Sequence, residues 1–291
     1  MNTYLLPEKM KALQARVRTD VQDFLVNNRP EDSTLVLDST GVTATRHYVL
    51  LNAIGRERLL RFKEIHVFSG GAFALFGFLG LTSNSARLTF PDLRAHHTEK
   101  AFRSYHHKGM MSVPSALLNL VRRKSVFSSN DPVYAMLDHI FRPEYAHQPY
   151  SEFPSNVVVH LGRKGSPPIL RVSNGELCDE ECKSLRDKRL IDVIVSAVTV
   201  PMVYGRSDGA DHWFDPVYAG QYGKILRDTY STGAPTLVST PWKSGQKGNV
   251  RFANCFPSKR QKLDMLNDFA RLVLNLPNHG WGHDIYAAFE S

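Results

Sequence analysis

Residues 34–81 read TLVLDSTGVTATRHYVLLNAIGRERLLRFKEIHVFSGGAFALFGFLGL. The run Thr34–Asp38 is short, apolar and β-branched, which is typical of a buried strand. The small-residue turn Ser39–Ala44 follows, and then a helix is expected over His47–Ile54. A second strand, Glu64–Phe68, runs directly into a serine and two glycines, and a Phe- and Leu-rich helix is expected over 73–81. Strands that alternate with helices in this way predict a parallel sheet.

The rest of the chain continues the same alternation. Apolar residues at helical spacing predict a first helix over 8–26, and further helices are expected over 176–189, Ile191–Val198, 223–231 and Lys259–Leu276. Strands are expected over 156–161 and 234–241, and a turn-rich loop over 202–222. We therefore expect an α/β fold with a mostly parallel sheet flanked by helices on both faces. The chain is interpreted as one domain over 1–291, with a cap or insertion over 90–155.

Composition and net charge narrow the classes of partner and of protein that the chain fits. The chain has 291 residues, of which 42% are hydrophobic, and a net charge of +8, which favours acidic partners such as phosphate head groups or nucleic acid. We find no nucleic-acid-binding motif, so nucleic acid is the less favoured partner. Three cysteines exclude a disulfide scaffold and give no zinc pattern, and free thiols in a reducing compartment are expected.

Neither a secretory signal nor a membrane span is predicted. The N-terminus lacks an uninterrupted apolar run, and the most apolar stretch, Val67–Leu81, is too short to cross a bilayer. We expect a cytoplasmic protein that can contact a membrane peripherally.

The segment Arg94–Lys124 is unusually basic. It holds seven Lys and Arg residues against one acid, Glu99, together with the apolar stretch Met110–Leu120. This pattern predicts a basic amphipathic cap that docks on an anionic membrane surface. The segment also contains two pairs of adjacent histidines, His96/His97 and His106/His107. Adjacent histidines point in different directions, so we expect solvated side chains, no metal site and no cofactor.

Two features fall where an open α/β sheet binds its ligands, beyond the carboxyl ends of strands. The turn Ser39–Ala44 can point backbone N–H groups at an anion, helped by the positive end of the helix that follows. The stretch HVFSGGA places Ser69 between a strand and a helix, which is the layout of a nucleophile elbow. On its own, Ser-Gly-Gly is also common in plain turns.

Together these features resemble the patatin-like phospholipases, serine acyl hydrolases with a Ser–Asp dyad and a three-layer α/β fold. LVLDSTGVTATRHYVLLNAI is similar to the first half of the family's pattern, with His47 near the helix start. IHVFSGGAFALFGFL is similar to the second half, and IVSAVTVPMVYGRSDGADHWFDPVYAG to the stretch that holds the aspartate. The resemblance covers roughly 34–80 and 190–240, about a third of the chain. It departs at Val67, which replaces the first glycine of GxSxG, and at Pro216.

The resemblance implies a set of site residues. Ser69 is the nucleophile and Asp215 its general base, without a relaying histidine. Backbone N–H groups bind the oxyanion or substrate, from the set Ser39, Thr40, Gly41, Val42 and Gly70. Asp208 is the rival for the aspartate. His47 is interpreted as a structural residue at a helix start, and Asp38 as a cap or turn residue without a catalytic role.

The implied function is a lipid acyl hydrolase that cleaves ester-linked acyl chains from phospholipid or lysophospholipid. An aspartate can act as the base only if its carboxylate is partly desolvated, because one with an ordinary pKa is weakly basic at neutral pH. Two alternatives stay open: an acyltransferase or thioesterase that uses the same dyad, and a catalytically degenerate relative that binds lipid or protein.

Overall fold

A computed structural model describes residues 7–40, 44, 46–82, 118, 122, 130–164, 166–174, 185, 187–201 and 213–255. Within them the fold is α/β, built on one mixed sheet that is mostly parallel. The sheet order is β4-β3-β2-β1-β6-β8-β7, and β5 pairs with β3. The strands are β1 (Thr34–Leu37), β2 (Glu64–Phe68), β3 (Val157–Arg163), β4 (Ile169–Ser173), β5 (Trp213–Phe214), β6 (Thr236–Thr240), β7 (Gly245–Lys247) and β8 (Val250–Asn254).

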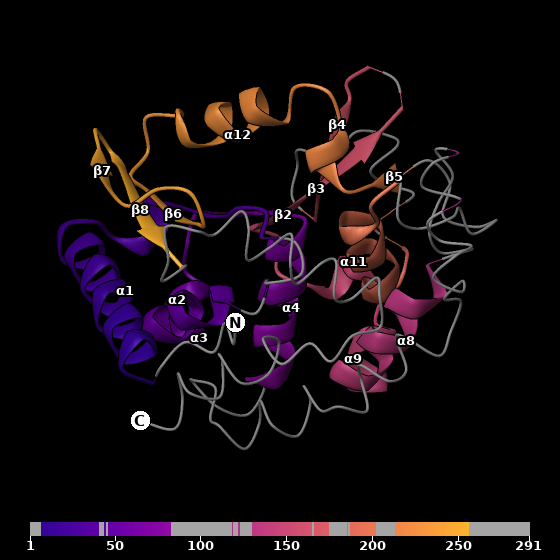
Figure 1. The fold of residues 1–291 in the computed structure, drawn as a ribbon, viewed down its shortest axis with the longest axis horizontal. Helices are drawn as coiled ribbons and strands as arrows, with labels where there is room; N and C mark the ends of the chain where they lie inside the picture. Colours follow the sequence, from indigo (N-terminus) through magenta and orange to yellow (C-terminus); the bar gives the residue numbers. More distant parts are fainter. Residues whose placement is uncertain are drawn as a thin grey trace.

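Helices cover both faces of this sheet. In Figure 1, α12 (Tyr222–Tyr230) lies above the sheet and the other described α-helices lie below it. Those below are α1 (Pro7–Asn27), α2 (His47–Ile54), α3 (Arg56–Leu59), α4 (Gly70–Leu81), α8 (Asp131–Ile140), α9 (Pro143–Ala146) and α11 (Leu190–Val198). The described residues also contain the short 3-10 helices η1 (Pro30–Asp32), η3 (Tyr150–Glu152) and η4 (Pro216–Tyr218).

Alternation along the central strands supplies both hydrophobic layers. Ile65 and Val67 of β2 pack into the larger core, between the sheet and the lower helices, whereas Phe68 packs into a smaller core between the sheet and α12. Successive side chains of a strand point to opposite faces, so a strand buried on both faces is mostly apolar. This explains why the central strands could be recognised as continuous apolar runs.

Two glycines bring α4 close to its neighbours. A Cβ built on Gly71 would lie 2.9 Å from the Cβ of Leu37 and closer still to the Leu37 carbonyl oxygen. A Cβ built on Gly77 would collide with the hydroxyl of Tyr48 in α2. Because neither position has room for a side chain, α4 packs directly against the end of β1 and against α2.

The expected α/β fold is confirmed, and several elements were missed. The strand at 64–68 matches β2, and those at 34–38, 156–161 and 234–241 correspond to β1, β3 and β6. The antiparallel strands β4, β5 and β7, and the parallel strand β8, were not expected. The loop expected over 202–222 contains β5 and η4 in its described part, and α4 begins three residues earlier than expected.

Several expectations fall largely outside the described residues. These are the basic cap Arg94–Lys124 apart from Leu118 and Arg122, most of the helix at 176–189, and the helix Lys259–Leu276. Cys255 is buried with a free thiol. Among the residues that the structure describes, every helix is too short or too polar to cross a bilayer.

Candidate active site

Ser69 occupies a sharp turn between β2 and α4. The strand ends at Phe68, the helix begins at Gly70, and Ser69 has φ 50° and ψ −123°. A non-glycine residue rarely adopts a positive φ, and such strain is found most often where surrounding structure holds a functional side chain in place. The absence of a side chain at Gly71 lets this turn pack against Leu37, at the end of β1. The turn therefore has the geometry of a nucleophile elbow.

Asp215 is brought to the same place by β5. The strand pairs antiparallel with the end of β3, placing Phe214 opposite Gly162 and Trp213 opposite Arg163. Because β4 occupies one edge of β3 as far as Gly162, β5 lies along the other edge, beyond the point where β2 ends. A Cβ on Gly162 would lie 2.8 Å from the Phe214 ring, so glycine permits this pairing. The Asp215 N–H also donates to the carbonyl oxygen of Thr199, at 2.8 Å.

The two side chains form a buried dyad. The Ser69 hydroxyl donates a hydrogen bond to Asp215 Oδ2, with 2.5 Å between the oxygens. The other carboxylate oxygen, Oδ1, accepts the N–H of Val217 at 3.0 Å. Ser69 is 2% exposed and Asp215 is 4% exposed. Burial raises the pKa of Asp215 to about 7, while the hydrogen bonds from Ser69 and Val217 oppose that rise.

This arrangement satisfies the requirements for base-activated nucleophilic attack. A serine hydroxyl needs a neighbouring group that removes its proton as it attacks. A base works best when its pKa lies near the working pH, and desolvation brings the pKa of Asp215 into that range. The sequence-predicted nucleophile and base are thus within hydrogen-bonding distance, although 146 residues separate them in the chain.

The residues expected to bind an oxyanion lie on two elements. Gly70 is the first residue of α4, where a helix has N–H groups without intrahelical acceptors and a favourable dipole for negative charge. Ser39 and Thr40 directly follow β1 after Asp38, and the Ser39 N–H donates to the Asp38 carboxylate at 2.7 Å. Gly41, Val42 and the rival aspartate Asp208 lie outside the described residues.

His47 is buried behind this turn. Its Nε2 lies 2.9 Å from the Asp38 carbonyl oxygen, which can only accept, so Nε2 carries the proton. Its Nδ1 therefore accepts from the Ser239 hydroxyl, at 2.7 Å. Burial lowers the pKa of His47 to about 4, so the ring is neutral at physiological pH. These contacts agree with a structural role at the helix start.

The Asp38 carboxylate has more partners than its interpretation as a cap or turn residue suggested. Oδ1 accepts from the Tyr222 hydroxyl as well as from Ser39, and Oδ2 accepts from the Thr240 hydroxyl at 2.7 Å. Burial raises the pKa of Asp38, and these hydrogen bonds counteract the rise. Sequence reasoning missed Tyr222 and Thr240. Thr240 ends the strand β6, so applying the strand-end rule to that strand too would have found it.

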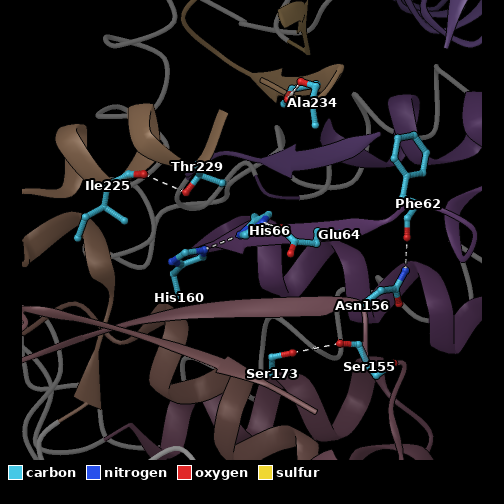
Figure 2. Close-up of polar contacts among 11 residues, drawn as sticks. Phe62, Glu64, His66, Ser155, Asn156, His160, Ser173, Ile225, Thr229 and Ala234 are labelled. Carbon is cyan, nitrogen blue, oxygen red and sulfur yellow. Dashed lines mark hydrogen bonds and ion pairs between the residues drawn. The ribbon is translucent and has the colours of Figure 1, made fainter. Parts of the chain in front are cut away.

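A second unexpected cluster lies on the sheet face opposite α4. Figure 2 shows His66 of β2 beside His160 of β3, with Glu64 next to them. The Glu64 carboxylate accepts from His66 Nε2 at 2.9 Å, and His66 Nδ1 lies 3.0 Å from His160 Nε2. His160 also stacks on Phe68, with ring centroids 4.0 Å apart. Burial lowers the pKa of both histidines.

This cluster does not make a metal centre. Among the described residues, no three His, Cys, Asp or Glu side chains converge as metal ligands would. Burial lowers the pKa of both histidines, so both rings are taken as neutral; with His66 Nε2 donating to the Glu64 carboxylate, His66 Nδ1 then accepts from His160 Nε2.

Comparison with known proteins adds no assignment. The chain matches no protein-family model and no curated protein.

Proposed function

We propose that the chain is a serine acyl hydrolase in which Ser69 is the nucleophile and Asp215 the general base. The observation that carries the proposal is the 2.5 Å hydrogen bond between Ser69 Oγ and Asp215 Oδ2, at a positive-φ turn beyond a central parallel strand. Both side chains are buried, and the carboxylate has a pKa near neutrality. The patatin-like three-layer architecture, which the motifs suggest, is part of the same proposal.

The reaction follows from the contacts of the dyad. As Ser69 Oγ bonds to the carbonyl carbon of an ester, Asp215 Oδ2 takes its proton. The tetrahedral intermediate collapses, the ester C–O bond breaks, and the leaving alkoxide takes that proton from Asp215. Water then attacks the acyl-enzyme, Asp215 accepts a proton from the water, and the proton returns to Ser69 Oγ as the fatty acid departs.

Negative charge develops on the carbonyl oxygen during both steps. We assign its stabilisation to the Gly70 N–H and to the turn that follows β1, within the set Ser39, Thr40, Gly41 and Val42. The Ser39 N–H already donates to Asp38, so the other members of the set are the better candidates. Loss of one oxyanion donor typically lowers kcat by about 10²–10³.

The substrate class is proposed to be phospholipid or lysophospholipid. The motifs resemble those of lipid acyl hydrolases, and exposed apolar or aromatic side chains follow Asp215 in the chain and lie beyond the end of β6. Val217, whose N–H contacts Asp215, is 36% exposed, and its neighbour Tyr218 is 53% exposed. Trp242, which follows β6 at the same edge of the sheet, is 43% exposed. Such side chains offer surface that acyl chains can contact.

The decisive experiment is labelling with a serine-reactive fluorophosphonate, followed by mass-spectrometric mapping of the modified peptide. We expect the label on Ser69, loss of labelling in Ser69→Ala, and unchanged labelling in Ser244→Ala, which alters an exposed loop serine. A lipid panel with product identification then shows whether water or another acceptor receives the acyl group. An unlabelled wild-type protein, or a label on another serine, would refute the proposal.

The proposed membrane contact through Arg94–Lys124 has its own test. Changing Arg122, Arg123 and Lys124 to Glu should reduce the rate on anionic vesicles and leave the rate on a soluble ester unchanged. The reason is that each basic side chain near an anionic surface contributes about 1 kcal/mol. Equal vesicle rates for the wild type and the triple variant at low salt would exclude docking through these residues.

A further inference from the structure

The residue before the turn that follows β1 is Asp38, whose carboxylate accepts hydrogen bonds from the turn, from α12 and from β6. Oδ1 of Asp38 accepts the hydroxyl of Tyr222, from α12, and the N–H of Ser39, the first residue of the turn. Oδ2 accepts the hydroxyl of Thr240, from β6. The side chain of Asp38 is almost fully buried, so these three donors replace the water that the carboxylate loses on folding.

Tyr222 also contacts the strand that leads to the nucleophile. Its ring packs edge-on against Phe68, with centroids 5.7 Å apart, and Phe68 directly precedes Ser69. Tyr222 is the first residue of α12, seven residues after Asp215. A short segment of chain therefore carries both the proposed base and a tyrosine that packs against the residue before Ser69. Among the described residues, the Tyr222 hydroxyl bonds Asp38 and neither member of the dyad.

We propose that Tyr222 is a positioning residue, which acts through the Asp38 carboxylate to fix the backbone at Ser39 relative to Ser69. This inference rests on the proposed function, because it concerns the turn that is assigned to oxyanion binding. The N–H of Ser39 and the hydroxyl of Tyr222 share one carboxylate oxygen, so movement of the tyrosine is transmitted to the start of the turn. The Phe68 contact ties the same ring to the elbow.

A buried carboxylate is an expensive way to hold a turn together if only stability is required. Apolar side chains of similar shape can replace a buried charged group with little loss of stability, whereas hydrogen bonds to a carboxylate fix direction as well as distance. The backbone next to an oxyanion turn needs that directional control, because an error of about 1 Å in a reacting group can lower the rate about 10²-fold.

The test compares two Tyr→Phe changes on one helix. Tyr222→Phe removes the hydroxyl that bonds Asp38 and keeps the ring on Phe68. Tyr230→Phe, at the end of α12, is the matched control, because its ring packs against Phe252, with centroids 5.8 Å apart. For each variant we would measure kcat and KM with a soluble nitrophenyl ester, the pH midpoint, and the fraction of active sites titrated by a fluorophosphonate.

We expect Tyr222→Phe to lower kcat about 10- to 100-fold, with KM, the pH midpoint and the titrated fraction unchanged. Tyr230→Phe should behave as the wild type. A purely structural role for Tyr222 would reduce kcat and the titrated fraction by the same factor, and that result would overturn the inference. Wild-type kcat in Tyr222→Phe would overturn it as well.

Two further results complete the design. If Tyr222→Phe does not fold, Thr240→Val removes a different donor to Asp38 and keeps the side-chain shape. The inference then requires a lower kcat at a full titrated fraction, and an unchanged kcat contradicts it. A wild-type protein that neither labels nor hydrolyses esters overturns the proposed function and this inference together. An active wild type with an unaffected Tyr222→Phe overturns the inference alone.

Discussion

The ionisation of Asp215 predicts how activity depends on pH. Burial raises the pKa of this carboxyl from its ordinary value of 3.8 to about 7, against the opposing hydrogen bonds from Ser69 and Val217. Only the ionised carboxylate can take the proton of Ser69. The rate of acylation should therefore follow the ionised fraction of Asp215, rising with pH and levelling off above neutrality.

The size of the effect follows from that pKa. At pH 5, two units below it, about 1% of the carboxyl is ionised, so kcat/KM should lie about 100-fold below its plateau. An aspartate with its ordinary pKa of 3.8 is more than about 90% ionised at pH 5 and would give a flat profile above that pH. His47, with a pKa lowered to about 4, stays mostly neutral above pH 5 and therefore adds no second ionisation to the pH profile.

The assay is kcat/KM for an uncharged nitrophenyl ester between pH 5 and 9. Fluorophosphonate titration at each pH corrects for any loss of folded protein. A flat profile from pH 5 to 8 would refute the assignment of Asp215 as a desolvated base. So would a fall in rate with rising pH over the same interval.

The pH dependence of the free energy of unfolding tests the raised pKa of Asp215 independently of activity. Because the folded state raises the pKa of Asp215, it binds the proton more tightly than the unfolded state. The resulting stabilisation is complete below about pH 4 and is lost as the pH rises through about 7, a change of about 4 kcal/mol. Asp215→Asn lacks this titration, so the wild type should lose stability relative to that variant between pH 4 and pH 8, as measured by urea unfolding.

Three further predictions concern the elbow and its partner. Ser69→Ala and Asp215→Asn should each lower kcat by several orders of magnitude, and the double variant should be little worse than either, because the two residues act as one unit. Independent, multiplicative losses of kcat would contradict Asp215 as the base for Ser69. Ser69→Gly should be more stable to heat than Ser69→Ala by about 1 kcal/mol. The positive φ costs a non-glycine residue about 1–3 kcal/mol, and the greater entropy of glycine in the unfolded chain cancels about 0.4–1 kcal/mol of that advantage. Equal melting temperatures would contradict backbone strain at Ser69. Gly71→Ala should lower the free energy of unfolding in urea by about 1–3 kcal/mol, because the added Cβ collides with Leu37. Gly223→Ala is the control in α12: its Cβ meets only Arg227, at 3.5 Å, so this change should raise the free energy of unfolding by about 0.5–1 kcal/mol.

The central strands were predictable from sequence because each is buried on both faces. In β1 the residues Thr34–Leu37 are all buried, and in β2 only Glu64 is partly exposed. Such burial favours a mainly apolar or β-branched run, even though β2 also buries His66, and such a run is visible without any knowledge of the neighbouring strands.

The strands at the two margins of the sheet gave no such signal. In β4, Arg171 is exposed, and all three residues of β7 are exposed. In β5 there are only two residues, and they form a strand only because they pair with β3. Elements that depend on a partner for their definition cannot be recognised from local composition.

The site residues also differ in whether a local sequence pattern identifies them. The elbow at Ser69 is local, because a strand, a serine and two glycines follow one another in the chain. Tyr222 and Thr240 meet Asp38 across 184 and 202 residues, and neither belongs to a motif. Asp215 lies between these cases, since the motif resemblance pointed to it and β5 brings it to Ser69.

Two buried carboxylates at this edge of the sheet have raised pKa values, and their hydrogen bonds decide which one can act as a base. Asp38 accepts from the Tyr222 and Thr240 hydroxyls and from the Ser39 N–H, all of which stabilise its anion and none of which belongs to a nucleophile at an elbow. Asp215 has one side-chain donor, the Ser69 hydroxyl, and that donor is the proton source in the proposed mechanism. Burial alone would allow either carboxylate to be the base. The identity of the donors favours Asp215 as the base in the proposed reaction and Asp38 as the residue that holds the turn.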